Sequence, residues 1–310
     1  MDQETVDQYS GVLASIIAKR LLRPAPANLW HYTNGDGLIR ILESGELWST
    51  QVSCLNDATE FKYAIRLARE AFRRRRLSGG KLSSDDLFLL DQIEIELAED
   101  GTETAGYFVA CLSQRADDLS QWRAYGTGEG GYAISFQVGA LSGSPNSSGS
   151  HLFPLTYNPA IQNAVVDEVV TETFALFRDG LTKQPGLSRE DWAKAFLPVW
   201  GDRAGYLAPL LKDPAFEAEW EWRLVKRFDQ TDIPKMKYRQ RQSMLSRHLP
   251  LVFAPTEGRT NPSLPITEIM VGPSRHKESS RIAIGDMLAT RGYPSGQVRV
   301  TKSAAPYQSL

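Results

Sequence analysis

The stretch Asn28-Leu29-Trp30-His31-Tyr32-Thr33-Asn34-Gly35, followed by the apolar run Gly37-Leu38-Ile39-Arg40-Ile41-Leu42, decides the predicted fold. The pattern is typical of a short buried strand that ends in polar side chains and turns into a helix. His31, Tyr32 and Thr33 thus carry three hydrogen-bonding groups at the end of a rigid element, where binding sites are common. The alternative is that His31 is a core histidine whose ring nitrogens bind neighbouring backbone.

Composition places the chain among folded proteins. Its 310 residues are 42% hydrophobic and 23% charged, which is enough for one large core or two smaller ones. The formal net charge of -2 argues against a general electrostatic nucleic-acid binder, although a local basic patch is still allowed. The sequence has neither a long apolar stretch nor a secretory signal pattern, so we expect a cytoplasmic protein without a membrane span.

The cysteines and histidines do not follow the spacing of a metal site. Cys54 and Cys111 are the two cysteines, and they lie far apart. The four histidines are scattered as well: His31, His151, His248 and His276. This distribution predicts neither a disulfide scaffold nor a bound metal.

Helical and strand periodicities alternate along the chain. Predicted helices cover 6–22, 85–98, 159–177, 189–211 and 280–291, and predicted strands cover 46–52, 107–113, 132–136, 151–157, 266–272 and 297–301. Trp192, Phe196 and Trp200 share a helical face and are predicted to be core. The polar 139–149 segment is predicted to be a surface loop.

This succession predicts an α+β fold with a mixed, mostly antiparallel sheet core. No stretch reads as a linker between independent domains. We therefore expect an N-terminal helix and lead-in over residues 1–28, and one α+β domain over 29–310 with helical insertions at about 57–99 and 159–212.

Two charged features have structural explanations. Asp57 and Glu60 have the spacing of a reciprocal helix N-terminal cap. The helix that follows this cap is predicted to run through Phe61, Ile65, Leu67, Ala68 and Phe72. It ends in the run Arg73-Arg74-Arg75-Arg76, where cations suit the helix dipole. Binding of phosphate or nucleic acid is the alternative for this run.

The segment Phe216–Val225 carries a second candidate site. If it is a strand, Glu219, Glu221 and Arg223 share one face and the apolar residues between them share the other. Two neighbouring carboxylates repel each other, which raises the pKa of one of them unless a cation compensates. The alternative is an exposed strand face whose acids and arginine pair in solvent.

The motifs in combination resemble the bacterial domain-of-unknown-function family DUF2971. The resemblance extends from about Leu29 to the C-terminal part of the chain, and each motif is short. The motifs are Trp30-His31-Tyr32-Thr33, Gly37 to Leu42, Leu55-Asn56-Asp57 with Glu60, Val109 to Ser113, Trp122 and Tyr125 with Gly131 to Phe136, Glu219 to Arg223, Ile269 to Pro273, and Lys302 to Tyr307.

A strand that ends in His-x-Thr and a late Glu-x-Glu are also similar to the ADP-ribosyltransferase superfamily, although its Ser-Thr-Ser motif is missing. This resemblance implies that His31 and Thr33 orient NAD, that Glu221 is the catalytic acid and that Glu219 serves the acceptor. The remaining predicted binding residues are Tyr32, Trp122 and Tyr125, as stacking candidates, and Arg223.

The resemblance implies an NAD-dependent ADP-ribosyltransferase, a bacterial toxin or defence effector that modifies a protein or nucleic acid. NAD as substrate, a macromolecular acceptor and a neutralising partner are then expected, without a metal. Three alternatives stay open. They are an NAD glycohydrolase, a hydrolase acting on nucleic acid, and a non-enzymatic nucleotide- or partner-binding module that uses Arg73 to Arg76 and surface tryptophans.

Overall fold

The computed structural model describes residues 3–55, 59–78, 82–98, 106–126, 130–142, 149–241, 244–253 and 264–306. Asp57, predicted to cap a helix, and Tyr307 of the last motif lie outside these residues. The contacts divide the chain into two compact units. The first comprises Met1–Arg23, Val52–Tyr107 and Leu155–Phe216, and the second comprises Pro24–Gln51, Phe108–Pro154 and Glu217–Leu310. Both predicted helical insertions fall within the first unit.

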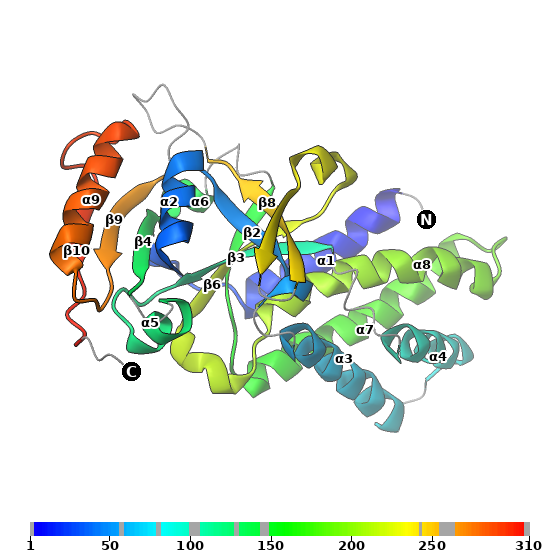
Figure 1. The fold of residues 1–310 in the computed structure, drawn as a ribbon. Coiled ribbons are helices and arrows are strands. Elements are labelled where there is room, and N and C mark those ends of the chain that lie inside the picture. The colour runs from blue at the N-terminus through cyan, green and yellow to red at the C-terminus, as the bar shows by residue number, and fades with distance from the viewer. Residues whose placement is uncertain are drawn as a thin grey trace. The chain divides into compact units, whose positions relative to one another are not determined.

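The first unit is built from helices (Figure 1). They are α1 (Gln3–Arg20), α3 (Thr59–Leu77), α4 (Ser84–Ala98), α7 (Pro159–Lys183) and α8 (Arg189–Ala204). Trp192, Phe196 and Trp200 are buried in its core, which confirms their predicted role. Trp192 packs directly on Gly180 of α7, where a Cβ atom would lie 2.0 Å from the indole ring, and its Nε1 donates to the Phe177 carbonyl at 3.1 Å. Only glycine allows this contact between α7 and α8.

The arginine run lies at the end of α3 and is engaged with other helices of the first unit. Arg74 contacts Asp167 at 2.8 Å, and Arg76 contacts Asp91 at 2.7 Å. The Arg75 guanidinium lies over a phenylalanine ring of α7. These contacts favour the structural explanation of the run over a phosphate-binding one.

The second unit holds the sheet, apart from Tyr107 at the start of β3. The described strands are β1 (Asn28–Thr33), β2 (Leu47–Gln51), β3 (Tyr107–Ser113), β4 (Tyr132–Gln137), β5 (Ser150–Pro154), β6 (Glu221–Arg227), β7 (Lys237–Arg241), β8 (Met244–Leu251), β9 (Ile266–Val271) and β10 (Arg299–Lys302). Their order is β10-β9-β4-β1-β3-β2-β8-β7, and β6 pairs with β3 and with β5. The β9–β10 pair is parallel, whereas β1, β2 and β4 pair in antiparallel fashion with their neighbours. The predicted α+β class with a mixed, mostly antiparallel sheet is confirmed, while its likeness to ADP-ribosyltransferases stays a prediction.

Helices α2 (Gly35–Ser44), α5 (Leu119–Tyr125), α6 (Val138–Ser142) and α9 (Lys277–Thr290) belong to the second unit. Helix α2 follows β1 at once, because the Asn34 side chain accepts a hydrogen bond from the Gly37 N–H at 2.9 Å and caps the helix. It ends at Gly45, whose φ of 64° lies in the left-handed region that glycine tolerates. Helix α6 lies where the sequence predicted a loop, since Val138 and Leu141 are buried.

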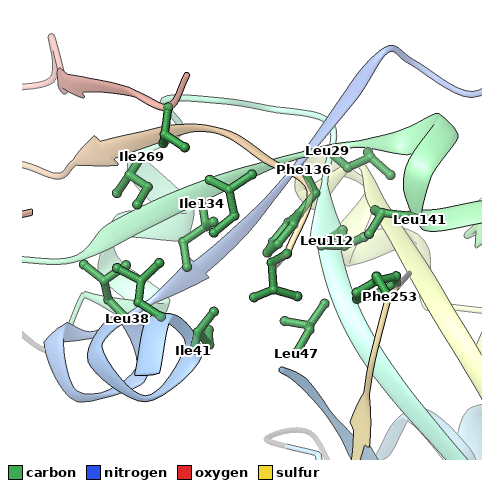
Figure 2. Close-up of a cluster of buried hydrophobic side chains, with 14 of the residues drawn as sticks. Leu29, Leu38, Ile41, Leu47, Leu112, Ile134, Phe136, Leu141, Phe253 and Ile269 are labelled. Atoms are coloured by element: carbon green, nitrogen blue, oxygen red, sulfur yellow. The ribbon is translucent and has the colours of Figure 1, made fainter. Parts of the chain in front are cut away.

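The core of the second unit forms between the sheet and its helices. Figure 2 shows Leu38 and Ile41 of α2 beside apolar strand side chains such as Ile134. The other labelled members are Leu29, Leu47, Leu112, Phe136, Leu141, Phe253 and Ile269. The spacing of Leu38, Ile41 and Leu42 gives α2 one apolar side, and its burial fixes the position of β1 and of the polar residues at its end.

No helix in the described ranges is long and apolar enough to cross a membrane.

Candidate functional site

A pocket in the second unit brings together residues from β1, β3, α5 and the start of β6. Its lining residues are Trp30, His31, Tyr32, Cys111, Leu112, Ser113, Gln121, Tyr125, Glu219 and Glu221. Its volume of about 40 Å³ accommodates a few water molecules or one end of a ligand, at about 10–15 Å³ per water. A larger ligand would therefore extend beyond the pocket.

The pocket lies where β1 and β3 pair over a short length. The two strands share one register pair, Trp30 with Ser113. Beyond it, the His31 ring contacts the backbone of β3, and His31 Nδ1 lies 3.0 Å from the Cys111 carbonyl oxygen. A ring nitrogen facing a carbonyl must carry the proton, so Nδ1 donates and Nε2 is left as a hydrogen-bond acceptor.

His31 is neutral at physiological pH. Burial lowers the pKa of its imidazole below the usual value, the hydrogen bond to Cys111 raises it in part, and the positive charge of Arg239 lowers it further. A neutral imidazole with Nε2 as acceptor suits a hydrogen-bond donor such as a ligand hydroxyl. Among the described residues, the bond of Nδ1 to Cys111 realises the alternative prediction of a backbone-bonded histidine for that nitrogen.

Tyr32 and Trp122 form an aromatic pair beside the pocket. Their ring centroids are 4.7 Å apart at 71°, an edge-to-face contact. The Tyr32 hydroxyl donates to the Arg115 carbonyl at 2.8 Å and accepts from the Asp118 N–H at 3.1 Å. Burial raises the pKa of Tyr32, so its phenol stays protonated. These contacts fix the turn between β3 and α5, which delivers Gln121 and Tyr125 to the pocket.

The two glutamates reach the pocket by a route that the sequence did not predict. Glu219 belongs to the 3-10 helix η4 (Pro214–Glu219) and β6 begins at Glu221, so the condition of one strand over Phe216–Val225 is met only from Glu221 onward. Trp220 stands between them with a φ of 48°, a conformation that is strained for a bulky side chain. This turn places both carboxylates along the same pocket.

Hydrogen bonds from the end of β3 hold this turn. Ser113 Oγ donates to the Glu219 carbonyl at 2.8 Å, and the Gln114 N–H donates to the Trp220 carbonyl at 3.1 Å. The position of Glu221 is therefore tied to β3, the strand that also holds His31.

Arg223 forms a buried ion pair with the carboxylate of Glu221 in the second unit. Its Nε lies 2.7 Å from Oε1 and its Nη2 lies 3.2 Å from Oε2, a two-point contact. The side chains are 1% and 7% exposed, respectively. Such a pair keeps the carboxylate charged and oriented, because removing either charge leaves the other buried alone. The predicted proximity of Glu221 and Arg223 thus holds, in the interior and not on an exposed face.

The predicted site residues divide into two groups. Of those predicted, His31, Tyr32, Tyr125, Glu219 and Glu221 line the pocket. The remaining three lie outside the set of described residues that line it: Thr33, Trp122 and Arg223. Thr33 Oγ1 packs against the start of α2, where a Cβ atom on Gly37 would approach it to 1.9 Å.

Five lining residues were not predicted. They are Trp30, Cys111, Leu112, Ser113 and Gln121. Cys111, Leu112 and Ser113 belong to β3, whose sequence is that of an ordinary buried strand. Only the pairing of β3 with β1 shows that these residues line a pocket. No local sequence signal marks Gln121 either, because its burial, at 7% exposed, is a property of the fold.

Within the described residues, no three His, Cys, Asp or Glu side chains gather as metal ligands.

Comparison of the chain with curated proteins and with solved structures gave no match. A family model does match. The matched segment runs from α5 through the start of β6, so it includes the pocket residues Gln121, Tyr125, Glu219 and Glu221. Residues 121–224 match the family described as a protein of unknown function, DUF2971, which confirms the predicted family resemblance over this segment.

Proposed function

We propose that this protein binds NAD, cleaves its nicotinamide–ribose bond and transfers ADP-ribose to a macromolecular acceptor. One observation carries the proposal: His31 of β1 and Glu221 of β6, distant in sequence, line the same pocket. This is the pairing of an orienting histidine and a carboxylate that the resemblance to ADP-ribosyltransferases implies.

The chemistry suits these groups. When the bond breaks, nicotinamide leaves with the electron pair and positive charge develops on the ribose C1′. A fixed carboxylate stabilises that charge more in the transition state than in the ground state. Glu221 is such a group, since Arg223 holds it charged and in one orientation. The Nε2 of neutral His31 would accept a hydrogen bond from a ribose hydroxyl.

Glu219 supplies the second role. The nucleophile on the acceptor forms a bond to C1′ and loses its proton, and a neighbouring carboxylate can take that proton. Glu219 lines the same pocket from the other side of the Trp220 turn. With water as the nucleophile the same groups would give NAD hydrolysis, so the acceptor decides between transfer and hydrolysis.

The test compares nicotinamide release from NAD by wild type, Glu221→Gln and a matched control. Glu268→Gln is that control, because Glu268 is also a mostly buried glutamate of the second unit, held by Arg299 and Thr301 of β10. We expect Glu221→Gln to slow release about 100- to 1000-fold and Glu268→Gln to leave it unchanged.

Assays with and without cell extract as a source of acceptor separate transfer from hydrolysis. Tight NAD binding by wild type without any release would favour the non-enzymatic binding module instead. Wild type that neither binds NAD nor releases nicotinamide, with extract present, would refute the proposal.

A further inference from the structure

Trp220 stands out among the aromatic side chains of the second unit. It lies between the two pocket glutamates, yet its side chain is 40% exposed. Its backbone is left-handed, with a φ of 48°. Glycine is the residue that such a conformation favours, so a tryptophan at this position carries backbone strain. Part of its ring nevertheless stays in contact with solvent, where a ligand could reach it.

A second planar group accompanies the ring. The Arg115 guanidinium carbon lies 5.5 Å from the centroid of the Trp220 ring. Arg115 is itself half exposed and contacts Asp118 at 3.2 Å. Its backbone carbonyl accepts the hydrogen bond from Tyr32, so the turn that carries Arg115 is fixed to the pocket wall. Aromatic rings and guanidinium planes are the surfaces on which proteins stack nucleobases.

The size of the pocket gives a reason for such a surface. About 40 Å³ takes only one end of a ligand, so most of a nucleotide would lie outside. Trp220 stands in the chain between Glu219 and Glu221, and the Arg115 N–H donates to Ser113 Oγ at 3.1 Å, so both residues are joined to residues that line the pocket. The exposed parts of their side chains are therefore a surface next to the pocket.

We propose that Trp220 and Arg115 form a stacking site for a nucleobase beside the pocket. The base has two sources: the adenine of NAD, or a base of a single-stranded nucleic-acid acceptor. Assigning the base to NAD or to a nucleic-acid acceptor rests on the proposed function. The stacking site itself rests on the exposure of Trp220, its left-handed backbone and its contact with Arg115.

The experiment measures binding of AMP, of NAD and of a short single-stranded oligonucleotide by titration calorimetry. Ribose 5-phosphate, which lacks a base, is the ligand control. Trp220→Ala and Trp220→Gly remove the ring, and Trp220→Phe retains an aromatic surface. Tyr238→Ala is the matched control variant, since Tyr238 is an aromatic residue of the second unit that is 60% exposed on β7.

We expect Trp220→Ala and Trp220→Gly to weaken base binding about tenfold, and Trp220→Phe and Tyr238→Ala to change it little. Urea denaturation is run on every variant, and base binding is compared per folded molecule, so that a loss of stability is not counted as a loss of the stacking site. Weaker binding of AMP and NAD identifies adenine as the base, and weaker binding of the oligonucleotide alone identifies the acceptor.

Three results would overturn the stacking site: no binding of any base by wild type, equal base binding by wild type and Trp220→Gly, or an equal loss in Tyr238→Ala. Nicotinamide release is measured separately on the same wild-type protein. Base binding that depends on Trp220, together with no release from NAD, would sustain the stacking site and refute the proposed transferase.

Discussion

Strand β6 carries two buried ion pairs in different surroundings. Glu221 and Arg223 pair at its start, and Lys226 pairs with Asp232 at 3.1 Å near its end. All four side chains are less than 10% exposed. Asp232 also accepts a hydrogen bond from the Asp229 N–H and completes the cap of a 3-10 helix, η5 (Gln230–Lys235).

The two carboxylates thus differ in what else they face. Asp232 uses its oxygens on the fold, whereas Glu221 also borders a pocket. Burial of a charged pair therefore does not distinguish these two places. The pocket beside Glu221 is the reason for proposing a function for one pair and not for the other.

The largest expected effect is the loss of the cation beside Glu221. Arg223→Met should lower the free energy of unfolding by about 3–5 kcal/mol, because the Glu221 carboxylate loses its two-point contact while it stays buried. Lys226→Met should lower it by less, because Lys235 still lies 3.9 Å from the Asp232 carboxylate. Urea denaturation measures both. The comparison predicts that the two variants differ in nicotinamide release per folded molecule. Arg223→Met should abolish this release, and Lys226→Met should preserve it. If both variants released nicotinamide equally well, the two pairs would have the same role.

Removing both charges at the start of β6 should cost less than removing one. The double variant Glu221→Met with Arg223→Met has no unpaired charge, so we expect it to recover at least about 2 kcal/mol of the stability lost in Arg223→Met. A double-mutant cycle by urea denaturation gives the coupling between the two residues. Additive losses would mean that the 2.7 Å contact contributes little.

A smaller effect should appear in the pH dependence of stability. The pKa of His31 is lowered in the folded state, chiefly by burial, so below about pH 6.5 the unfolded chain binds a proton that the folded chain does not. Stability should fall as the pH drops through this range, by no more than about 1.4 kcal/mol per pH unit for one proton. Unfolding at several pH values measures the slope, which His31→Gln should reduce. An unchanged slope would mean that the protons taken up on unfolding bind to groups other than His31.

The smallest effect is expected for an exposed pair of the first unit. Arg74 and Asp167 are both about half exposed, so solvent screens their contact. Arg74→Ala should change the free energy of unfolding by less than about 1 kcal/mol and leave nicotinamide release intact. A loss in base or oligonucleotide binding by this variant would revive the phosphate-binding explanation of the arginine run.

The sequence predicted the elements better than their connections. Local periodicity is sufficient for α2, since the apolar spacing, the Asn34 cap and the Gly45 stop all lie within one short segment. The pairing of β1 with β3 is decided by contacts between distant residues, and no local pattern reveals it. The pocket residues Cys111 and Ser113 were therefore missed.

Glu219 and Glu221 lie along one pocket for a reason that the sequence did not reveal. Alternation along a strand was the reason for grouping them, but the strand begins only at Glu221. The two carboxylates share a pocket because the backbone turns at Trp220. A positive φ at a tryptophan goes against local preference, so sequence reasoning could not anticipate it.

The one-register contact between β1 and β3 also has a kinetic consequence. The segment from β9 through α9 to β10 is continuous in sequence. The chain between these two paired strands is short, so bringing them together costs little entropy and the pair can form early in folding. The pocket needs β1, β3 and β6, which are separated by most of the chain, to meet in one place. Refolding should therefore restore secondary structure before it restores whatever the pocket binds, and a lag between the two signals would measure the time needed to bring these strands together.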